Sequence, residues 1–217
     1  MHTRQQMVRI GGLITLLVIA SVAQLFAQRV ANDVDPVREY ALGLELYQKQ
    51  KFAASQERFD RALAHHRDLT SIQQENARFY QASSALQLFN EDGETLMRNF
   101  IQAHPEHPMV NLGNFELAKM HFAKKRYNSV LKSLAEVDVE ALDEKYLEEY
   151  YFKKGYSHFQ QEEYEESKAA LSQVLNGGKK YRSPALYYSS YILYREGNNE
   201  AAWPDSKSWR VINYLAA

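Results

Sequence analysis

From Asp35 onward, apolar residues recur at three- and four-residue spacing, and this spacing predicts one amphipathic helix after another. In the first of these segments the stripe includes Tyr40, Leu44 and Tyr47. Asp35-Pro36 predicts where this helix begins, because an aspartate side chain caps a first turn and proline is tolerated at the first helical position. Proline and glycine are scarce through the middle of the chain, which favours long helices over sheet and loop.

The stripes recur as a double pattern every 35 to 39 residues. Each copy has a long apolar stripe with a small residue inside it, a turn that ends in an aromatic residue, and a shorter second stripe. Clear copies begin at Tyr40, Phe115 and Tyr151, and a fourth begins at Tyr187 and then breaks off. One helical hairpin cannot bury its own apolar face, whereas three or more stacked hairpins can, so repetition at this period predicts an all-α solenoid.

Equivalent positions of the copies carry equivalent residues. Gly43, Ala118, Gly155 and Ser190 are the small residues, and we expect the partner helix to approach the backbone there. The segment from Leu69 to His107 is the poorest copy, which we interpret as a repeat with Ala82 as its small residue and a shortened loop at Asn90 to Glu94. The structural positions of the repeats are Gly43, Phe52, Phe59, Ala62, Ala118, Tyr127, Gly155 and Tyr164.

These positions resemble the tetratricopeptide repeat (TPR), in which a Leu-Gly or Leu-Ala pair lies in the first helix and an aromatic residue closes the turn. Leu42-Gly43 and Leu117-Ala118 match the pair, whereas Lys154 stands where the family has leucine and Ser167 where it has alanine. The resemblance covers roughly residues 36 to 202. It implies a right-handed α-solenoid of four to five antiparallel helix pairs, with the first helix of each pair lining a concave side.

Aromatic residues fall on the face that this family turns toward its groove. An aromatic-lined groove suits recognition of polypeptide segments, because rigid rings give contact area at a low entropy cost. The alternative is that the rings fill the core between repeats, as aromatic stripes at helical spacing usually do. The candidate groove residues are Tyr40, Tyr47, Phe79, Phe122, Phe152, Tyr156, Phe159, Tyr187, Tyr191 and Tyr194.

The N-terminus has the pattern of a secretory signal peptide. Arg4 and Arg9 precede a nearly continuous apolar run, and a small residue follows at a plausible cleavage site. We expect cleavage after Ala27, with Ala23 as the second choice, so that residues 1–27 are removed and 28–202 form the repeat array. The alternative is an uncleaved anchor, in which residues 10–27 are retained as a transmembrane helix near the lower limit of length.

The repeat pattern stops after Ala202, and residues 203–217 form an irregular tail that holds both tryptophans. Pro204 stands where the first turns of a second helix are expected, and proline inside a helix costs about 3 kcal/mol. For a suitable choice of codons, reading the gene one base out of frame over this stretch gives a sequence that fits a good second helix. We therefore expect a truncated longer repeat protein, with an uncapped last repeat prone to self-association.

Composition and motifs restrict the kinds of binding and catalytic sites that the chain can hold. The formal net charge of −1 gives no case for nucleic acid, and the absence of cysteine excludes disulfides and thiolate metal sites. His65-His66 and the His104–His107 pair lack further ligands nearby, and the acidic runs are typical of solvated helix faces. No phosphate-binding loop or nucleophile motif appears. We therefore expect no metal, no cofactor and no catalytic residues.

The expected function is a non-catalytic exported scaffold that binds protein or peptide segments. The chain resembles the N-terminal part of long exported multi-repeat TPR proteins of Gram-negative bacteria, some of which assist envelope assembly or secretion. That resemblance implies a periplasmic or outer-membrane-associated location. The alternative is a membrane-anchored accessory subunit, which requires the N-terminal segment to stay uncleaved.

Overall fold

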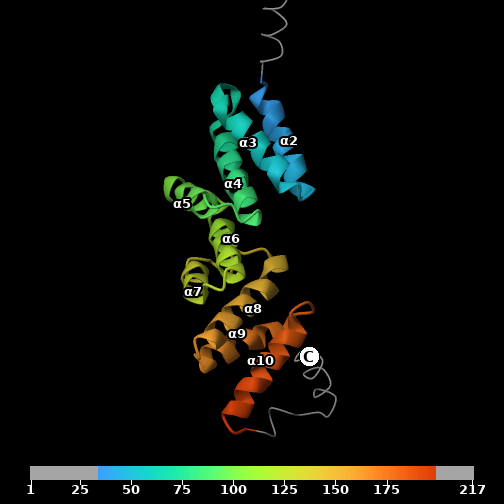
Figure 1. The fold of residues 1–217 in the computed structure, drawn as a ribbon, viewed down its shortest axis with the longest axis vertical. Coiled ribbons are helices and arrows are strands. Elements are labelled where there is room, and N and C mark those ends of the chain that lie inside the picture. The colour runs from blue at the N-terminus through green and yellow to red at the C-terminus, as the bar shows by residue number, and fades with distance from the viewer. Residues whose placement is uncertain (1–33, 199–217) are drawn as a thin grey trace, which may run out of the picture.

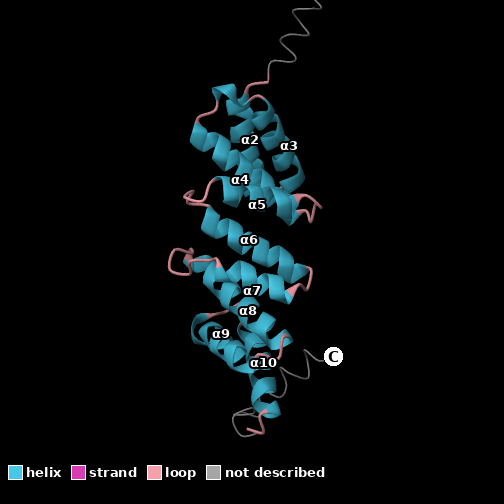
Figure 2. Ribbon diagram, turned by 90° about the vertical axis from the view of Figure 1, so that its left-hand side faces the viewer, coloured by secondary structure: helices cyan, strands magenta, loops and turns pink. Residues whose placement is uncertain are grey.

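A computed structural model describes residues 34–198, and its helices stack in pairs along one long axis (Figure 1). Every regular element in this range is a helix, and no strand occurs within it (Figure 2). The prediction of an all-α solenoid is therefore confirmed. The elements are α2 (Pro36–Gln48), α3 (Phe52–Ala64), a 3₁₀ turn (His66–Asp68), α4 (Ser71–Gln87), α5 (Gly93–Ala103), α6 (Val110–Ala123), α7 (Tyr127–Ala135), α8 (Glu144–Gln160), α9 (Tyr164–Gly177) and α10 (Arg182–Arg195).

The first helix begins where the sequence predicts. The Asp35 side chain accepts hydrogen bonds from the backbone N–H groups of Val37 and Arg38, and Pro36 is the first helical residue. The aspartate satisfies amides that have no partner inside the helix, and proline has no amide to satisfy at that position.

One turn geometry closes the first helix of every repeat. A residue with positive φ lies just beyond the helix end, and the next N–H returns to a carbonyl five residues back, as from Lys51 to Leu46 at 2.9 Å. This is the Schellman arrangement, which satisfies the free carbonyls of a helix end. Successive members are 39, 36, 37 and 35 residues apart, which confirms the repeat period. The five positive-φ residues are Gln50, Phe89, Lys125, Glu162 and Gly197.

The small residues of the repeats are contact points between paired helices. A Cβ atom on Gly43 would lie 2.8 Å from Cε1 of Phe59, and one on Gly155 would lie 2.7 Å from Cγ of Leu171. Both distances are below van der Waals contact, so glycine is required for this approach. All five small residues precede the positive-φ residue by the same interval and all are buried: Gly43, Ala82, Ala118, Gly155 and Ser190.

The aromatic residues that close the turns also lie as expected. Phe52, Tyr127 and Tyr164 are the first residues of α3, α7 and α9. In the second helix of the first repeat, Phe59 and Ala62 are fully buried. The repeat positions taken from the sequence therefore describe the real contacts of the hairpins.

The second repeat differs from its predicted form. Its interhelical loop is longer than the others, not shorter: it runs from residue 88 to 92, whereas the first repeat needs only residues 49 to 51. The extra residues delay the start of α5 to Gly93. A Cβ atom on Gly93 would lie 2.9 Å from the backbone carbon of Ala85, so this glycine lets α5 begin against α4.

None of the helices between residues 34 and 198 is long and apolar enough to cross a membrane. The predicted signal peptide, the alternative anchor at residues 10–27 and the predicted break after Ala202 lie outside the described residues.

Candidate interaction surface

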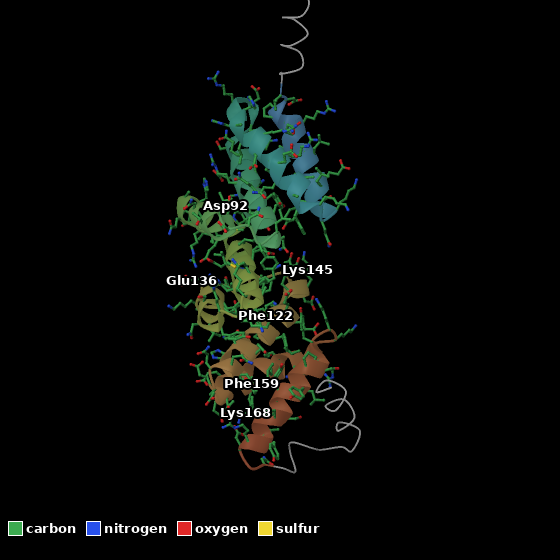
Figure 3. All side chains as sticks on the ribbon, in the orientation of Figure 1. Asp92, Phe122, Glu136, Lys145, Phe159 and Lys168 are labelled. Carbon is green, nitrogen blue, oxygen red and sulfur yellow. The ribbon has the colours of Figure 1, made fainter. Side chains whose placement is uncertain are left out.

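The first helices of four repeats, together with the start of α3, surround a hollow of about 640 Å³, here called the groove. It joins residues far apart in the sequence, because the start of α8 lies across from α2. Lys145 is labelled at this end of α8 in Figure 3. The principal lining residues are Leu44, Tyr47, Phe52, Tyr80, Gln87, Glu116, Lys119, Lys145 and Tyr146.

Aromatic rings form one wall of the groove. The Tyr47 ring packs edge-on against Tyr80, with centroids 4.8 Å apart, and against Phe52 at 5.5 Å. The Tyr47 hydroxyl is hydrogen-bonded to Ser83 Oγ at 2.7 Å. Burial raises the pKa of Tyr47 to about 12, so the phenol is neutral at physiological pH. The wall is a fixed surface of uncharged rings.

A buried carboxylate forms the floor. Glu116 is 5% exposed, and its two oxygens lie 2.7 Å from Nε2 of Gln87 and 2.7 Å from Nζ of Lys119. Burial raises the pKa of Glu116, and the ammonium of Lys119 acts in the opposite direction. The Lys119 side chain keeps 23% of its surface exposed beside Glu116. Lys145 keeps 63% of its surface exposed, with its Nζ 2.8 Å from Oδ2 of Asp143, so a ligand here meets two lysines that are each paired with a carboxylate.

A second hollow of about 200 Å³ adjoins the groove over Gln87, Glu116 and Lys119. Phe89 lines it from the turn after α4, with 54% of its surface exposed and a φ of 58°. A bulky residue with positive φ is an outlier, and the other four turns place a polar residue or glycine there. The neighbouring hollow therefore has an exposed apolar ring at its edge.

The candidate groove residues are distributed differently from the sequence prediction. Of the ten, Tyr47 alone is among the residues that line the groove described above. Phe79 and Phe152 are wrong as surface residues, because the core clusters beside α4 and α8 bury their rings. Tyr40 is half-buried and packs edge-on against Phe59 at 6.1 Å.

The remaining candidates pack mainly between neighbouring first helices. Lys153 Nζ covers the Phe122 ring at 4.0 Å. Tyr156 and Phe159 of α8 contact Tyr188 of α10, with ring centroids 4.8 and 4.9 Å apart, and Figure 3 labels Phe122 and Phe159 on this half of the molecule. Burial and the neighbouring Tyr156 raise the pKa of Tyr188. Much of this aromatic stripe is therefore core, which was the alternative interpretation.

Tyr187 also packs against Tyr188, at 5.1 Å, and it is half-buried. Tyr191 and Tyr194, near the end of α10, keep 38% and 56% of their surfaces exposed. Exposed rings thus lie at the C-terminal end of the described array, away from the groove.

Sequence reasoning missed most of the polar lining. A signal was present: Glu116 and Lys119 interrupt the apolar run from Phe115 to Met120, and charged residues on a buried stripe are functional candidates. No local pattern could place Lys145 and Tyr146 opposite α2, because that proximity depends on the path of the whole superhelix. Among residues 34–198, no group of three His, Asp or Glu side chains is placed to hold a metal ion.

No model of a known protein family matches the chain, and no curated protein matches it. Several solved structures share its fold. MamA AMB-1 is 13% identical with a TM-score of 0.64, over 85% of this chain and 93% of that one. MamA 41-end from Desulfovibrio magneticus RS-1 is 12% identical with a TM-score of 0.61, over 84% of this chain and 96% of that one.

A third structure, of a putative kinesin light chain with nearly identical TPR-like repeats from Podosopora anserina, is 13% identical with a TM-score of 0.57. The match covers 84% of this chain and 97% of that one. At these identities the likeness concerns the fold alone. The described part of this chain is a TPR-like α-solenoid.

Proposed function

We propose that the chain is a non-catalytic scaffold that binds extended polypeptide segments in the groove. The observation that carries this proposal is the combination of a rigid aromatic wall at Tyr47 and Tyr80 with the accessible ammonium groups of Lys119 and Lys145. Rings fixed in place bind apolar side chains at low entropy cost, and fixed donors orient the ligand.

The charge arrangement favours a segment with an acidic side chain beside an apolar one. Glu116 lies beneath Lys119 and holds its ammonium at 2.7 Å, so the lysine is positioned before a ligand arrives. Lys145 is likewise paired with Asp143, at 2.8 Å, so an acidic side chain entering the groove would share two ammonium groups that carboxylates of the chain already hold, whereas a basic one would meet two like charges. Complementary charge of this kind sets specificity and association rate more than affinity.

Affinity selection from a library of random twelve-residue peptides tests the proposal. We expect binders enriched in acidic and apolar residues. Lys119→Glu should weaken them by at least about 2 kcal/mol, the threshold of an interface hot spot, in isothermal titration calorimetry. The matched control is Lys132→Glu, a charge reversal at an exposed position of α7. If the two variants bound the selected peptides with equal affinity, the binding site would lie outside the groove.

We further propose that the scaffold is exported, and that in a Gram-negative cell it works in the periplasm or at the outer membrane in envelope assembly or secretion. The support is the N-terminal pattern of Arg4 and Arg9 followed by an apolar run and Ala27. The intact mass of the protein purified from its native host tests export. A mature chain that begins at Gln28 supports it, whereas a full-length chain in the membrane fraction favours the anchored accessory subunit.

A further inference from the structure

His121, near the end of α6, is 2% exposed, and neither of its ring nitrogens has a hydrogen-bond partner among the described residues. Its ring lies against α5, whose Glu94 carboxylate is 3.7 Å from Nε2. A buried neutral imidazole that makes no hydrogen bond leaves one donor and one acceptor unsatisfied, which costs some free energy. Protonation costs more, because a buried charge needs direct partners.

The surroundings of His121 are already rich in positive charge. Glu94 is held by Arg98, with Nη2 and Oε1 3.0 Å apart, and by Arg126 at 3.6 Å. Lys124 adds a further positive charge beyond the end of α6. A proton on His121 would therefore place a third cationic side chain against one carboxylate that two arginines share.

We propose that His121 is an acid-sensitive element of the α5–α6 junction, and that its protonation opens this junction. In the closed junction the ring is buried beside Glu94 of α5; once the junction opens, the imidazolium reaches water. Burial, which outweighs the opposing effect of Glu94, lowers the pKa of His121 from its usual value of 6.5. The sign follows from linkage: a depressed histidine pKa stabilises the closed form above about pH 6.5, and this stability is lost as the pH falls.

Because of where the junction lies, its opening would also affect binding in the groove, an effect that rests on the proposed function. The groove is lined by α2 and α4 on one side of the junction and by α6 and α8 on the other. Opening between α5 and α6 would separate the two sets of lining residues. Acid would then release a bound segment without any titration of the ligand.

Hydrogen–deuterium exchange of the full chain at pH 7.5 and 5.5, corrected for the intrinsic pH dependence of exchange, tests the junction without any ligand. One extra proton bound on opening changes the opening constant by up to about tenfold per pH unit. We therefore expect roughly tenfold more opening of residues 93–123 at pH 5.5. His121→Gln, which cannot titrate, should lose this response, whereas His65→Gln at an exposed position should keep it.

Comparing the pH responses of the wild type and His121→Gln isolates the contribution of His121. His107 is also buried, with an unpartnered Nε2 3.8 Å from Glu75, and it is present in both proteins. Equal pH responses in wild type and His121→Gln would overturn the proposal. If the variant does not fold, a nuclear magnetic resonance titration of wild-type His121 decides: protonation at or above pH 6.5 with unchanged amide protection also overturns it.

Discussion

Ser167 donates its hydroxyl hydrogen to the carbonyl oxygen of Gly155, with Oγ and O 2.8 Å apart, and Ser55 makes the same bond to Gly43 at 2.9 Å. Both serines are fully buried, and each glycine is the small residue at which the paired helices touch. A polar bond thus joins the two helices of the hairpin at their closest approach. This explains why Ser167 stands where the TPR pattern has alanine.

Ser167→Ala should destabilise the chain by about 0.5–1.5 kcal/mol, the usual net contribution of an intramolecular hydrogen bond. The Gly155 carbonyl keeps its place in the helix ladder, so the loss should not exceed this range. Urea unfolding followed by circular dichroism measures it. Unchanged or increased stability would mean that the hydrogen bond from the Ser167 hydroxyl does not stabilise the fold.

Gly155→Leu should overpack the fourth hairpin and cost about 1–3 kcal/mol. The side chain would start 2.7 Å from Cγ of Leu171, and 3.2 Å from the Leu171 backbone nitrogen, which cannot move aside. Gly43→Leu should act in the same direction against the Phe59 ring. Thermal unfolding gives the comparison.

Gly177→Ala is the matched control for these glycines. A Cβ atom there would meet nothing within 4 Å, and the residue is the last of α9. Alanine should therefore leave the melting temperature unchanged or raise it slightly. If Gly155→Leu and Gly177→Ala behaved alike, the glycines would not be packing sites.

Lys125→Gly should stabilise the protein by about 1 kcal/mol. Lys125 has a φ of 56°, which strains any side chain with a Cβ atom and suits glycine. The adjacent Lys124 has a φ of −84°, so Lys124→Gly should instead destabilise. Opposite shifts of the melting temperature are expected for two glycine substitutions one residue apart, and a shift of the same sign would refute the turn geometry.

Glu116→Gln should raise the stability at pH 7, because the amide avoids the cost of burying a charge. Burial raises the pKa of Glu116 above its usual 4.5, so the folded state binds this proton more readily than the unfolded state. The wild-type penalty is therefore full above the folded-state pKa and disappears as the pH falls below 4.5. The advantage of the variant in chemical unfolding should shrink over the same range, and an advantage independent of pH would contradict this origin.

The fold was predictable from the sequence because its determinants are local. Asp35 caps a helix, Gly43 and Gly155 admit a neighbour, and Phe52 closes a turn, each within one hairpin. The groove was not predictable in the same way. Whether a ring such as Phe79 or Tyr80 is buried depends on the rotation between adjacent repeats, which the repeat pattern does not encode. Tyr47 and Tyr146, which line the same groove, are brought to it by three such rotations.

Site-specific photo-crosslinking in the native host tests the central claim most directly, namely that partners bind in the groove. A photoreactive residue at Gln87 would lie in the groove, and one at Gln173 would lie in a separate hollow lined by α7, α8 and α9. We predict that the photoreactive residue at Gln87 crosslinks discrete partners and that these crosslinks disappear when Lys119→Glu is added. The one at Gln173 should crosslink none of the same partners. The same partners from Gln173, or adducts at Gln87 that persist with Lys119→Glu, would contradict the assignment of the groove as the binding site.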